Sequence, residues 1–344
     1  MRYQAAVFIG RFQPLHLAHL NEIKRSLSLA DNLIIVIGSY RTAITPKNPF
    51  TAEVREKMIR SCLNEQENQR VICVYVRDYL YNDTQWFSDV GRLVDQALLT
   101  ENIPQDEICL TGCNKDITSY YIASLPDSWK REIIQKPEKN LSATTIREKL
   151  FEGIEPKKIK GLPIAIRHYL ESYIDTSAFK KVQSEYHFYK DYKQKFKALP
   201  YPVTFVTTDA VVIKNGHVLI VERGMNPGKG FLALPGGHLD QNQSILDSTL
   251  RELKEETKIG VNKDYLKSIV SDTKVFDHVA RSLRGRTITH SSCFKLPDGG
   301  PLPEVRGGDD AARAFWMPIV EAYERCEEFF EDHIHIINYF TRRY

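Results

Sequence analysis

The sequence predicts an α/β protein in which a parallel-sheet domain precedes a β-rich α+β domain. Through residues 1–175, short apolar runs alternate with amphipathic stretches, which is typical of a parallel sheet covered by helices. From residue 201 onward the pattern becomes rich in strands, and the composition shifts near Leu199-Pro200. We therefore expect three parts. They are a first domain at 1–177, a connecting helix at 178–199 and a second domain at 200–344.

The first domain is expected to alternate strands with helices. Strands are expected at residues 3–9, 32–38, 71–76, 107–111 and 131–135. Helices are expected at residues 17–29, 51–65 and 85–100. In parallel sheets, ligands bind beyond the carboxyl ends of the strands. The first such end is Gly10-Arg11.

The connecting segment carries aromatic residues near heptad spacing among six lysines and only two acidic residues. We expect a helix that packs this aromatic seam on a neighbour. A single-stranded nucleic-acid patch is the alternative, because lysines interleaved with aromatics can bind such strands. In the second domain, strands are expected at 204–213, 217–222, 231–234, 265–276, 286–296 and 315–316, with a helix at 244–257 and a helical tail.

Composition narrows the class of protein. Apolar residues make up 42% of the 344 residues, charged residues make up 26%, and the net charge is +3, as in ordinary globular proteins. The longest aliphatic run, Leu33 to Ile37, is far shorter than the roughly 20 residues of a membrane span. The apolar stretch at 5–10 is too short for a secretory signal, so we expect a cytoplasmic protein.

Two further features bear on partners. Six scattered cysteines without a Cys-x-x-Cys pair argue against a zinc site and a disulfide framework. Outside the connecting segment the charge is near neutral, so we expect small-molecule substrates and neither nucleic acid nor a membrane as partner. Whether copies of the chain form a homo-oligomer is left open.

One motif follows the first strand directly. It reads Gly10-Arg11-Phe12-Gln13-Pro14-Leu15-His16-Leu17-Ala18-His19 and opens the first helix. A helix N-terminus presents unpaired N–H groups and partial positive charge, which favour phosphate. His16 and His19, three residues apart, project from the same first turn and can reach one polyphosphate. A lone His-x-x-His would indicate only surface histidines, but the strand, glycine and arginine around it favour a site.

This motif resembles the phosphate-binding signature of the nucleotidyltransferase superfamily, in the Gly-Arg-Phe-Gln-Pro form of archaeal-type nicotinamide mononucleotide (NMN) adenylyltransferases. Ala18 replaces the usual glycine. A second superfamily signature matches Ser142-Ala143-Thr144-Thr145-Ile146-Arg147. The resemblance implies a Rossmann-like nucleotidyltransferase domain. It implies that the ATP phosphates are bound by Gly10, Ser142, Thr144 and Arg147, and that Arg11, His16, His19 and Arg147 are catalytic.

Two more matches concern the second substrate. Arg41 and the run Asn48-Pro49-Phe50-Thr51-Ala52 with Arg55 resemble the segment after the second strand of these adenylyltransferases. Asn82 and Trp86 resemble the asparagine and tryptophan that hold the nicotinamide, and an aromatic face suits a cationic pyridinium. The resemblance thus implies NMN binding by Arg41, Asn82 and Trp86. Taken alone, a tryptophan at this position would more often be a core residue.

The second domain contains another motif, with Leu234-Pro235-Gly236-Gly237-His238-Leu239 followed by Arg251-Glu252-Leu253-Lys254-Glu255-Glu256-Thr257-Lys258-Ile259. On a helix, Glu252, Glu255 and Glu256 cluster opposite a leucine stripe. Like charges at i,i+4 cost a helix about 0.2 to 0.5 kcal/mol unless a cation lies between them. A hard divalent cation with oxygen ligands meets that need, whereas a solvated acidic face would leave the Gly-Gly pair unexplained.

This block resembles the Nudix box, with Gln243 in place of its first glutamate and Lys258 in place of its late glycine. The resemblance implies Mg²⁺, with Mn²⁺ as a substitute, bound by Gly237, Glu252, Glu255 and Glu256, and the same glutamates as catalytic residues. We expect Gln243 to weaken the support that Arg251 receives. The segment Arg281-Ser282-Leu283-Arg284-Gly285-Arg286 resembles a turn of ADP-ribose-type Nudix proteins. That likeness implies ADP-ribose binding by Arg281, Arg284 and Arg286.

Together the two domains resemble the bifunctional NMN adenylyltransferase/Nudix hydrolases of bacterial NAD metabolism. This implies that the first domain makes NAD from NMN and ATP, and that the second cleaves ADP-ribose to AMP and ribose 5-phosphate. One alternative is a monofunctional adenylyltransferase whose Nudix domain senses a ligand. A Nudix-fused transcription regulator is the other, but it would need a winged-helix segment, and the residues after the box match only Nudix strands and a tail.

Overall fold

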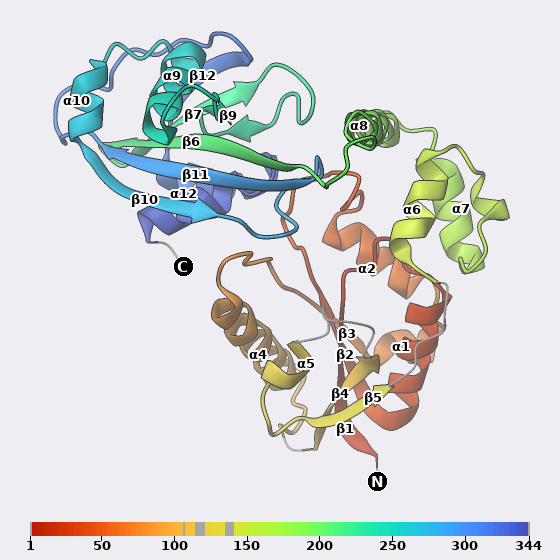
Figure 1. The fold of residues 1–344 in the computed structure, drawn as a ribbon. Helices are drawn as coiled ribbons and strands as arrows, with labels where there is room; N and C mark the ends of the chain where they lie inside the picture. Colours follow the sequence, from red (N-terminus) through yellow and green to blue (C-terminus); the bar gives the residue numbers. More distant parts are fainter. Residues whose placement is uncertain (1, 106, 114–120, 135–140, 343–344) are drawn as a thin grey trace. The chain divides into compact units, whose positions relative to one another are not determined.

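The computed structural model describes residues 2–105, 107–113, 121–134 and 141–342 (Figure 1). The chain divides into two compact units, Met1–Ser184 and Glu185–Tyr344. Each unit has its own β-sheet and its own hydrophobic core, as expected from the change of pattern along the sequence.

The sheet of the first unit is parallel throughout, with strand order β3-β2-β1-β4-β5. Its strands are β1 (Tyr3–Gly10), β2 (Ala30–Ile37), β3 (Val71–Tyr75), β4 (Ile108–Cys113) and β5 (Lys130–Ile134). The chain order reverses between β1 and β4. In open sheets a ligand crevice lies outside the carboxyl ends of the strands at such a reversal. The expected parallel sheet is confirmed, and the first motif begins at this point.

The helices of this unit lie between its strands and after the last of them. They are α1 (Leu17–Leu29), α2 (Ala52–Arg60), α3 (Glu65–Gln69), α4 (Asp83–Thr100), α5 (Tyr121–Ser124), α6 (Ala143–Phe151), the 3₁₀ helix η2 (Pro156–Lys158) and α7 (Ile164–Tyr173). The expectation of a single helix over 51–65 is wrong, because α2 ends at Arg60. Asn64 then starts α3 with a capping box, in which its side chain and that of Glu67 each accept the other's backbone N–H.

The core of the first unit lies around the central strands. Residues Leu33 to Ile37 of β2 are fully buried, which explains why the strand is one continuous apolar run. Val90, Val94 and Leu98 place one face of α4 against this core. The sheet is therefore a rigid platform for the loops that leave its carboxyl edge.

The expected connecting helix is α8 (Ser177–Gln194). Its aromatic seam is buried at Phe179 and Tyr189. In the first unit, the ring of Phe179 lies 5.7 Å from that of Phe151. In the second unit, the ring of Tyr192 lies 5.6 Å from that of Phe205.

The second unit contains a mixed sheet of order β10-β11-β6-β7-β12, in which only the β11–β6 pair of that path is parallel. Its strands are β6 (Thr204–Lys214), β7 (His217–Arg223), β8 (Leu232–Ala233), β9 (Gly236–His238), β10 (Val270–Phe276), β11 (Arg286–Lys295) and β12 (Ala311–Pro318). Its helices are α9 (Ile245–Thr257), α10 (Lys263–Ser268), α11 (Ile319–Glu324), the 3₁₀ helix η3 (Cys326–Glu328) and α12 (His333–Thr341).

Two expectations for this unit need correction. The strand expected over 265–276 begins only at Val270, because α10 occupies the preceding residues. Asn262 caps α10 by accepting the N–H groups of Asp264 (2.8 Å) and Tyr265 (3.2 Å), and the side chain of Leu266 is buried. The strand expected at 315–316 is the middle of the longer β12.

The leucine stripe of α9 faces the sheet, as expected. Leu250 and Leu253 pack against Ala210, Val212 and Leu219. Their burial turns the glutamates of α9 toward the other side of the helix. In the described ranges, no helix combines the length and the apolar character that crossing a membrane requires.

Candidate active sites

The first motif forms a tight turn at the end of β1. A Cβ on Gly10 would lie 2.8 Å from the buried Phe12 ring, so any other residue there would have to displace that ring. His16 stands at the N-cap of α1, and its ring stacks on that of His19 with centroids 3.7 Å apart and planes 15° apart. The first turn of α1 contains no acidic residue, so its partial positive charge is not offset locally. The structure thus brings the two predicted histidines together at a helix N-terminus.

Three cations gather beside this turn, namely Arg11, Lys47 and Arg147. The pKa of Arg147 is lowered to about 10, mainly by burial and next by the positive charge of Arg11. The pKa of Lys47 is lowered for the same two reasons, with burial as the larger cause and the charge of Arg11 as the next. Arg147 is buried, Lys47 is half-buried and Arg11 is exposed, so the group of like charges reaches the surface, where an anionic ligand would relieve their repulsion. Sequence reasoning missed Lys47, although it directly precedes the matched run Asn48–Ala52 and this position could have drawn attention to it.

The guanidinium of Arg147 is fixed by oxygen atoms from three segments. It donates to the carbonyl oxygens of Gln13 (2.6 Å) and Pro46 (3.0 Å) and to Oγ1 of Thr144 (3.2 Å). Ser142 occupies the N-cap of α6, but its side chain makes no capping hydrogen bond. The second signature therefore lies against the first, as the resemblance implied.

Arg55, on α2, ties the surrounding loops together. Its fully buried guanidinium donates to four carbonyl oxygens, those of Arg11 (2.8 Å), Gly38 (2.6 Å), Ser39 (3.0 Å) and Thr51 (3.1 Å). Burial lowers its pKa to about 10. The loops after β1 and β2 are thus held by one side chain that the sequence identified only as part of a matching run.

The residues expected at the nicotinamide have structural contacts of their own. Asn82 caps α4 by accepting the N–H of Gln85 at 3.1 Å. Trp86 is half-buried and packs against the core of the unit, with its ring 5.5 Å from that of Phe87. Arg41 lies in the loop after β2, with a positive φ of 52°.

In the second unit, the Gly-Gly pair lies under α9. A Cβ on Gly237 would be 2.4 Å from Oε1 of Glu252, and a Cβ on Gly236 would be 2.2 Å from the carbonyl oxygen of Thr208. The N–H of Gly236 donates to Oε2 of Glu256 at 3.0 Å. The carboxylate of Glu252 therefore explains Gly237, and the close approach of the β6 backbone explains Gly236.

Arg251 donates hydrogen bonds to three side chains of the box. Its Nη1 donates to Glu255 (2.8 Å), its Nη2 to Glu252 (2.8 Å) and its Nε to Oε1 of Gln243 (3.2 Å). Gln243 thus supports Arg251 by a hydrogen bond, but without the negative charge that a glutamate would add. The support that Arg251 receives is therefore weaker only in charge, because its hydrogen bond to residue 243 is kept.

Burial disfavours the charged form of two carboxylates of α9. It raises the pKa of Glu252, and it raises the pKa of Glu256 to about 8. Within the described ranges, no group of three or more acidic, histidine or cysteine side chains forms a ready metal cluster, and Glu255 is turned to Arg251. Glu252 and Glu256 nevertheless fit a divalent cation, because both are buried acids one helical turn apart and face the glycine backbone.

The three arginines expected at ADP-ribose lie in different settings. Arg281 is 4% exposed and forms a bidentate pair with Asp332, at 2.8 and 2.9 Å. Arg284 pairs with Glu331 at 3.1 Å, and Arg286 pairs with Asp277 at 3.7 Å near the surface. The contacts of Arg281 are those of a structural ion pair, whereas Arg286 keeps substantial exposure.

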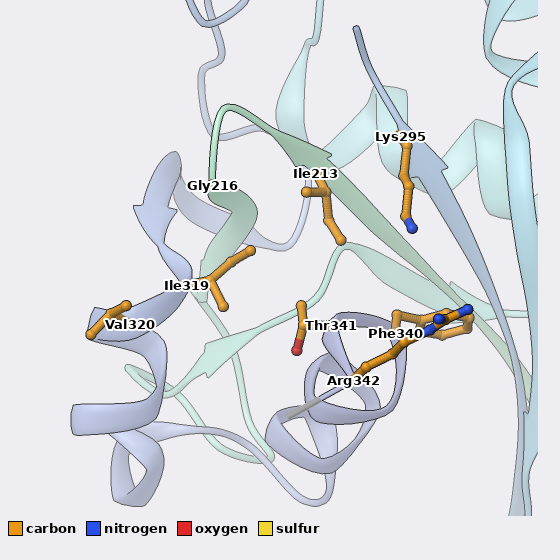
Figure 2. A pocket seen from close by; sticks show the side chains of 8 residues that line it. All are labelled: Ile213, Gly216, Lys295, Ile319, Val320, Phe340, Thr341 and Arg342. Carbon is orange, nitrogen blue, oxygen red and sulfur yellow. The ribbon is translucent and has the colours of Figure 1, made fainter. Parts of the chain in front are cut away.

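A cavity of about 590 Å³ lies elsewhere in this unit, between the β6–β7 turn, α11 and the end of α12 (Figure 2). Its walls include Ile213, Ile319 and Phe340, with Lys295 and Arg342 at one side. None of the predicted site residues lines it.

Comparisons with known proteins match a different family to each of the two units. A model of the cytidylyltransferase-like family matches residues 7–149, and a model of the NUDIX domain matches residues 204–340. The nicotinamide/nicotinic acid mononucleotide adenylyltransferase of Acinetobacter baylyi is 33% identical over 186 residues, which are 54% of this chain and 94% of that protein.

Solved structures extend the likeness to the whole chain. A bifunctional NMN adenylyltransferase/ADP ribose pyrophosphatase from Francisella tularensis, crystallised with AMP and a manganese ion, superposes with a TM-score of 0.90 at 33% identity. The match covers 99% of each chain. A second crystal structure of that protein gives a TM-score of 0.89. The chain therefore belongs to the family of bifunctional NMN adenylyltransferase/ADP-ribose pyrophosphatases.

Proposed function

We propose that the first unit joins NMN to the adenylyl group of ATP, giving NAD and pyrophosphate. The observation that carries this proposal is the group of Arg11, Lys47 and Arg147 beside the stacked His16–His19 pair, in which Arg147 is buried, Lys47 is half-buried and Arg11 is exposed. Such a group of positive and polar side chains at a helix N-terminus suits a polyphosphate.

In this reaction an oxygen of the NMN 5′-phosphate forms a bond to the α-phosphorus of ATP, while the bond to the departing pyrophosphate breaks. The attacking phosphate is already anionic, so the protein needs no general base. Arg11, His16, His19 and Arg147 would offset the developing negative charge, and most of the catalysis would come from positioning. The remaining proposed contacts are Gly10, Ser142 and Thr144 to the ATP phosphates, and Arg41, Asn82 and Trp86 to NMN.

We propose that the second unit hydrolyses ADP-ribose to AMP and ribose 5-phosphate. Water adds to one phosphorus of the diphosphate, and the bridging oxygen leaves with the other phosphate. Arg284 and Arg286 would hold the substrate. Arg281, whose buried guanidinium is engaged by Asp332, would shape the loop that carries them.

A divalent metal, which we propose to be Mg²⁺, would be held by Glu252, Glu255, Glu256 and the carbonyl of Gly237, and Mn²⁺ should replace it. When bound, such an ion lowers the pKa of a water molecule and offsets phosphate charge. Glu255 would have to exchange its contact with Arg251 for the metal. The manganese ion and AMP in the Francisella structure support this proposal.

The likeness over both domains favours two activities over an adenylyltransferase with a Nudix sensor. Because NMN, ATP and ADP-ribose are metabolites of the cell interior, we propose that the protein acts in the cytoplasm.

The direct test incubates the protein with NMN plus ATP and Mg²⁺, and separately with ADP-ribose and Mg²⁺, followed by identification of the products. We expect NAD with pyrophosphate in the first reaction, and AMP with ribose 5-phosphate in the second. Absence of AMP from the second, in the presence of NAD from the first, would contradict the hydrolase and favour the sensor.

A further inference from the structure

Two arginines of the second unit share one phenyl ring. The guanidinium carbon of Arg223 lies 4.3 Å from the centroid of Phe330, and that of Arg284 lies 5.8 Å from it. The ring is 4% exposed, and the backbone N–H of Phe330 donates to the carbonyl of Leu232 at 2.8 Å. A Cβ on Gly228 would be 2.3 Å from the ring, so the ring packs directly on that glycine. Phe330 is therefore a fixed platform for both cations.

Arg223, at the end of β7, is itself held in place. Its backbone N–H donates to the carbonyl of Phe231, and its Nε donates to the carbonyl of Pro227, both at 2.9 Å. The two arginines differ in their partners, because Arg284 forms an ion pair with Glu331. Over the described ranges, no ion pair includes Arg223, and no hydrogen bond leaves its Nη1 or Nη2. The guanidinium of Arg223 is thus held in position, and its Nη1 and Nη2 donors can bind a ligand.

The electrostatic surroundings indicate what that ligand is. The pKa of Arg223 is lowered, mainly by burial and next by the positive charge of Arg284. The carboxylates of Glu331 and Glu256 act to raise this pKa. The cation therefore stands close enough to Glu256 of the Nudix box to interact with it. An anion that reaches both arginines beside this carboxylate would relieve their repulsion.

We propose that Arg223 binds a phosphate of the substrate's diphosphate, with its guanidinium held flat by Phe330. A guanidinium presents parallel N–H donors that match two phosphate oxygens, which an ammonium group cannot do. This inference rests on the proposed hydrolysis of a nucleoside-diphosphate sugar. It adds a contact that neither the glutamates of α9 nor the 281–286 segment supplies.

The test replaces Arg223 by Gln and, separately, by Lys in the full-length chain. The control is Arg313→Gln, because Arg313 also stacks on a phenyl ring of the same sheet, that of Phe315 at 4.8 Å. Arg313 differs in being exposed and ion-paired with Glu222 at 2.7 Å. Three ligands or substrates are used. They are α,β-methylene-ADP-ribose, which is not hydrolysed at the diphosphate, adenosine, which lacks phosphate, and ADP-ribose itself.

We expect Arg223→Gln to weaken binding of the methylene analogue at least tenfold in calorimetry, and to lower kcat/KM for ADP-ribose at least as much. Adenosine binding, the rate of NAD synthesis and the melting temperature should stay unchanged, and Arg313→Gln should resemble the wild type throughout. Arg223→Lys should fall between the two, and it replaces the glutamine variant as the test if that variant does not fold.

Wild-type affinity of either folded Arg223 variant for the analogue would overturn the proposal. An equal loss of adenosine and analogue binding would also overturn it, because it would mark Arg223 as structural. A wild-type protein that binds the analogue but releases no AMP would instead contradict the hydrolase function, and Arg223 would still be judged by the analogue's Kd.

Discussion

At the scale of single residues, backbone carbonyls and not carboxylates hold Arg55 and Arg147, the buried cations of the first unit. Arg55 and Arg147 together donate to six carbonyl oxygens, and over the described ranges neither forms an ion pair with an acidic side chain. Carbonyl dipoles fix a guanidinium without cancelling its charge. The positive field of the site therefore remains available to an incoming polyphosphate.

Trp86 offers a test of the nicotinamide contact. If its ring stacks on the pyridinium, Trp86→Ala should raise the KM for NMN about tenfold, from a cation–π contribution of roughly 1 to 2 kcal/mol. The KM for ATP should barely change. Steady-state kinetics with each substrate varied in turn measures this, with a melting curve beside it. Equal increases for both substrates and a lower melting temperature would instead mark Trp86 as the core residue that its packing against the sheet indicates.

The Arg281–Asp332 pair predicts a large effect on stability. Both side chains are buried, and Asp332 raises the pKa of Arg281 although burial alone would lower it. Arg281→Met should cost about 3 to 5 kcal/mol in the free energy of unfolding of the second unit, because it removes the guanidinium that pairs with a buried carboxylate. The double variant with Asp332→Leu should recover most of that loss. Urea unfolding measures both, and a loss below 1 kcal/mol for the single variant would contradict a structural role.

At the scale of elements, patterns that depend on neighbouring residues could be read from the sequence, and those that depend on distant ones could not. The parallel strands of the first unit and the leucine stripe of α9 follow directly from apolar periodicity. The start of α10 was missed because the apolar residues of 265–276 suit a strand, although Asn262 before Asp264 is a capping signal. The role of Arg55 depends on loops far apart in sequence, so no local pattern reveals it.

The end of α9 predicts a stabilising substitution. Lys258 stands where the Nudix box has glycine and adopts a left-handed conformation, with φ at 49°. Lys258→Gly should raise the free energy of unfolding of this unit by about 0.5 to 1 kcal/mol, because glycine adopts this conformation without a Cβ penalty. Urea unfolding would show the change. As a control, Gly216→Ala, at a φ of 72° in an open turn, should lower stability. A destabilised Lys258→Gly would mean that its side chain packs usefully on Gly308.

At the scale of the whole molecule, each predicted site lies within one unit. The phosphate signatures at Gly10–His19 and Ser142–Arg147 meet in the first unit, and the Gly-Gly strand meets α9 in the second. The sequence was sufficient to assign these motifs. It could not show that Arg147 reaches the carbonyl of Gln13, or that Phe330 packs against Arg223 and Arg284, because these contacts arise only when separate segments fold together.

The central claim, two independent chemistries in one chain, is tested most directly by measuring both activities in His19→Ala and Glu256→Gln side by side. Glu256→Gln keeps the size of the side chain and removes a negative ligand, so it should lower AMP release from ADP-ribose by orders of magnitude at every Mg²⁺ concentration. Its rate of NAD synthesis should stay within about threefold of wild type, since distant sites usually act independently. His19→Ala should show the reverse, with NAD synthesis abolished and AMP release within about threefold. Loss of both activities in either folded variant, or undiminished AMP release in Glu256→Gln, would contradict the account.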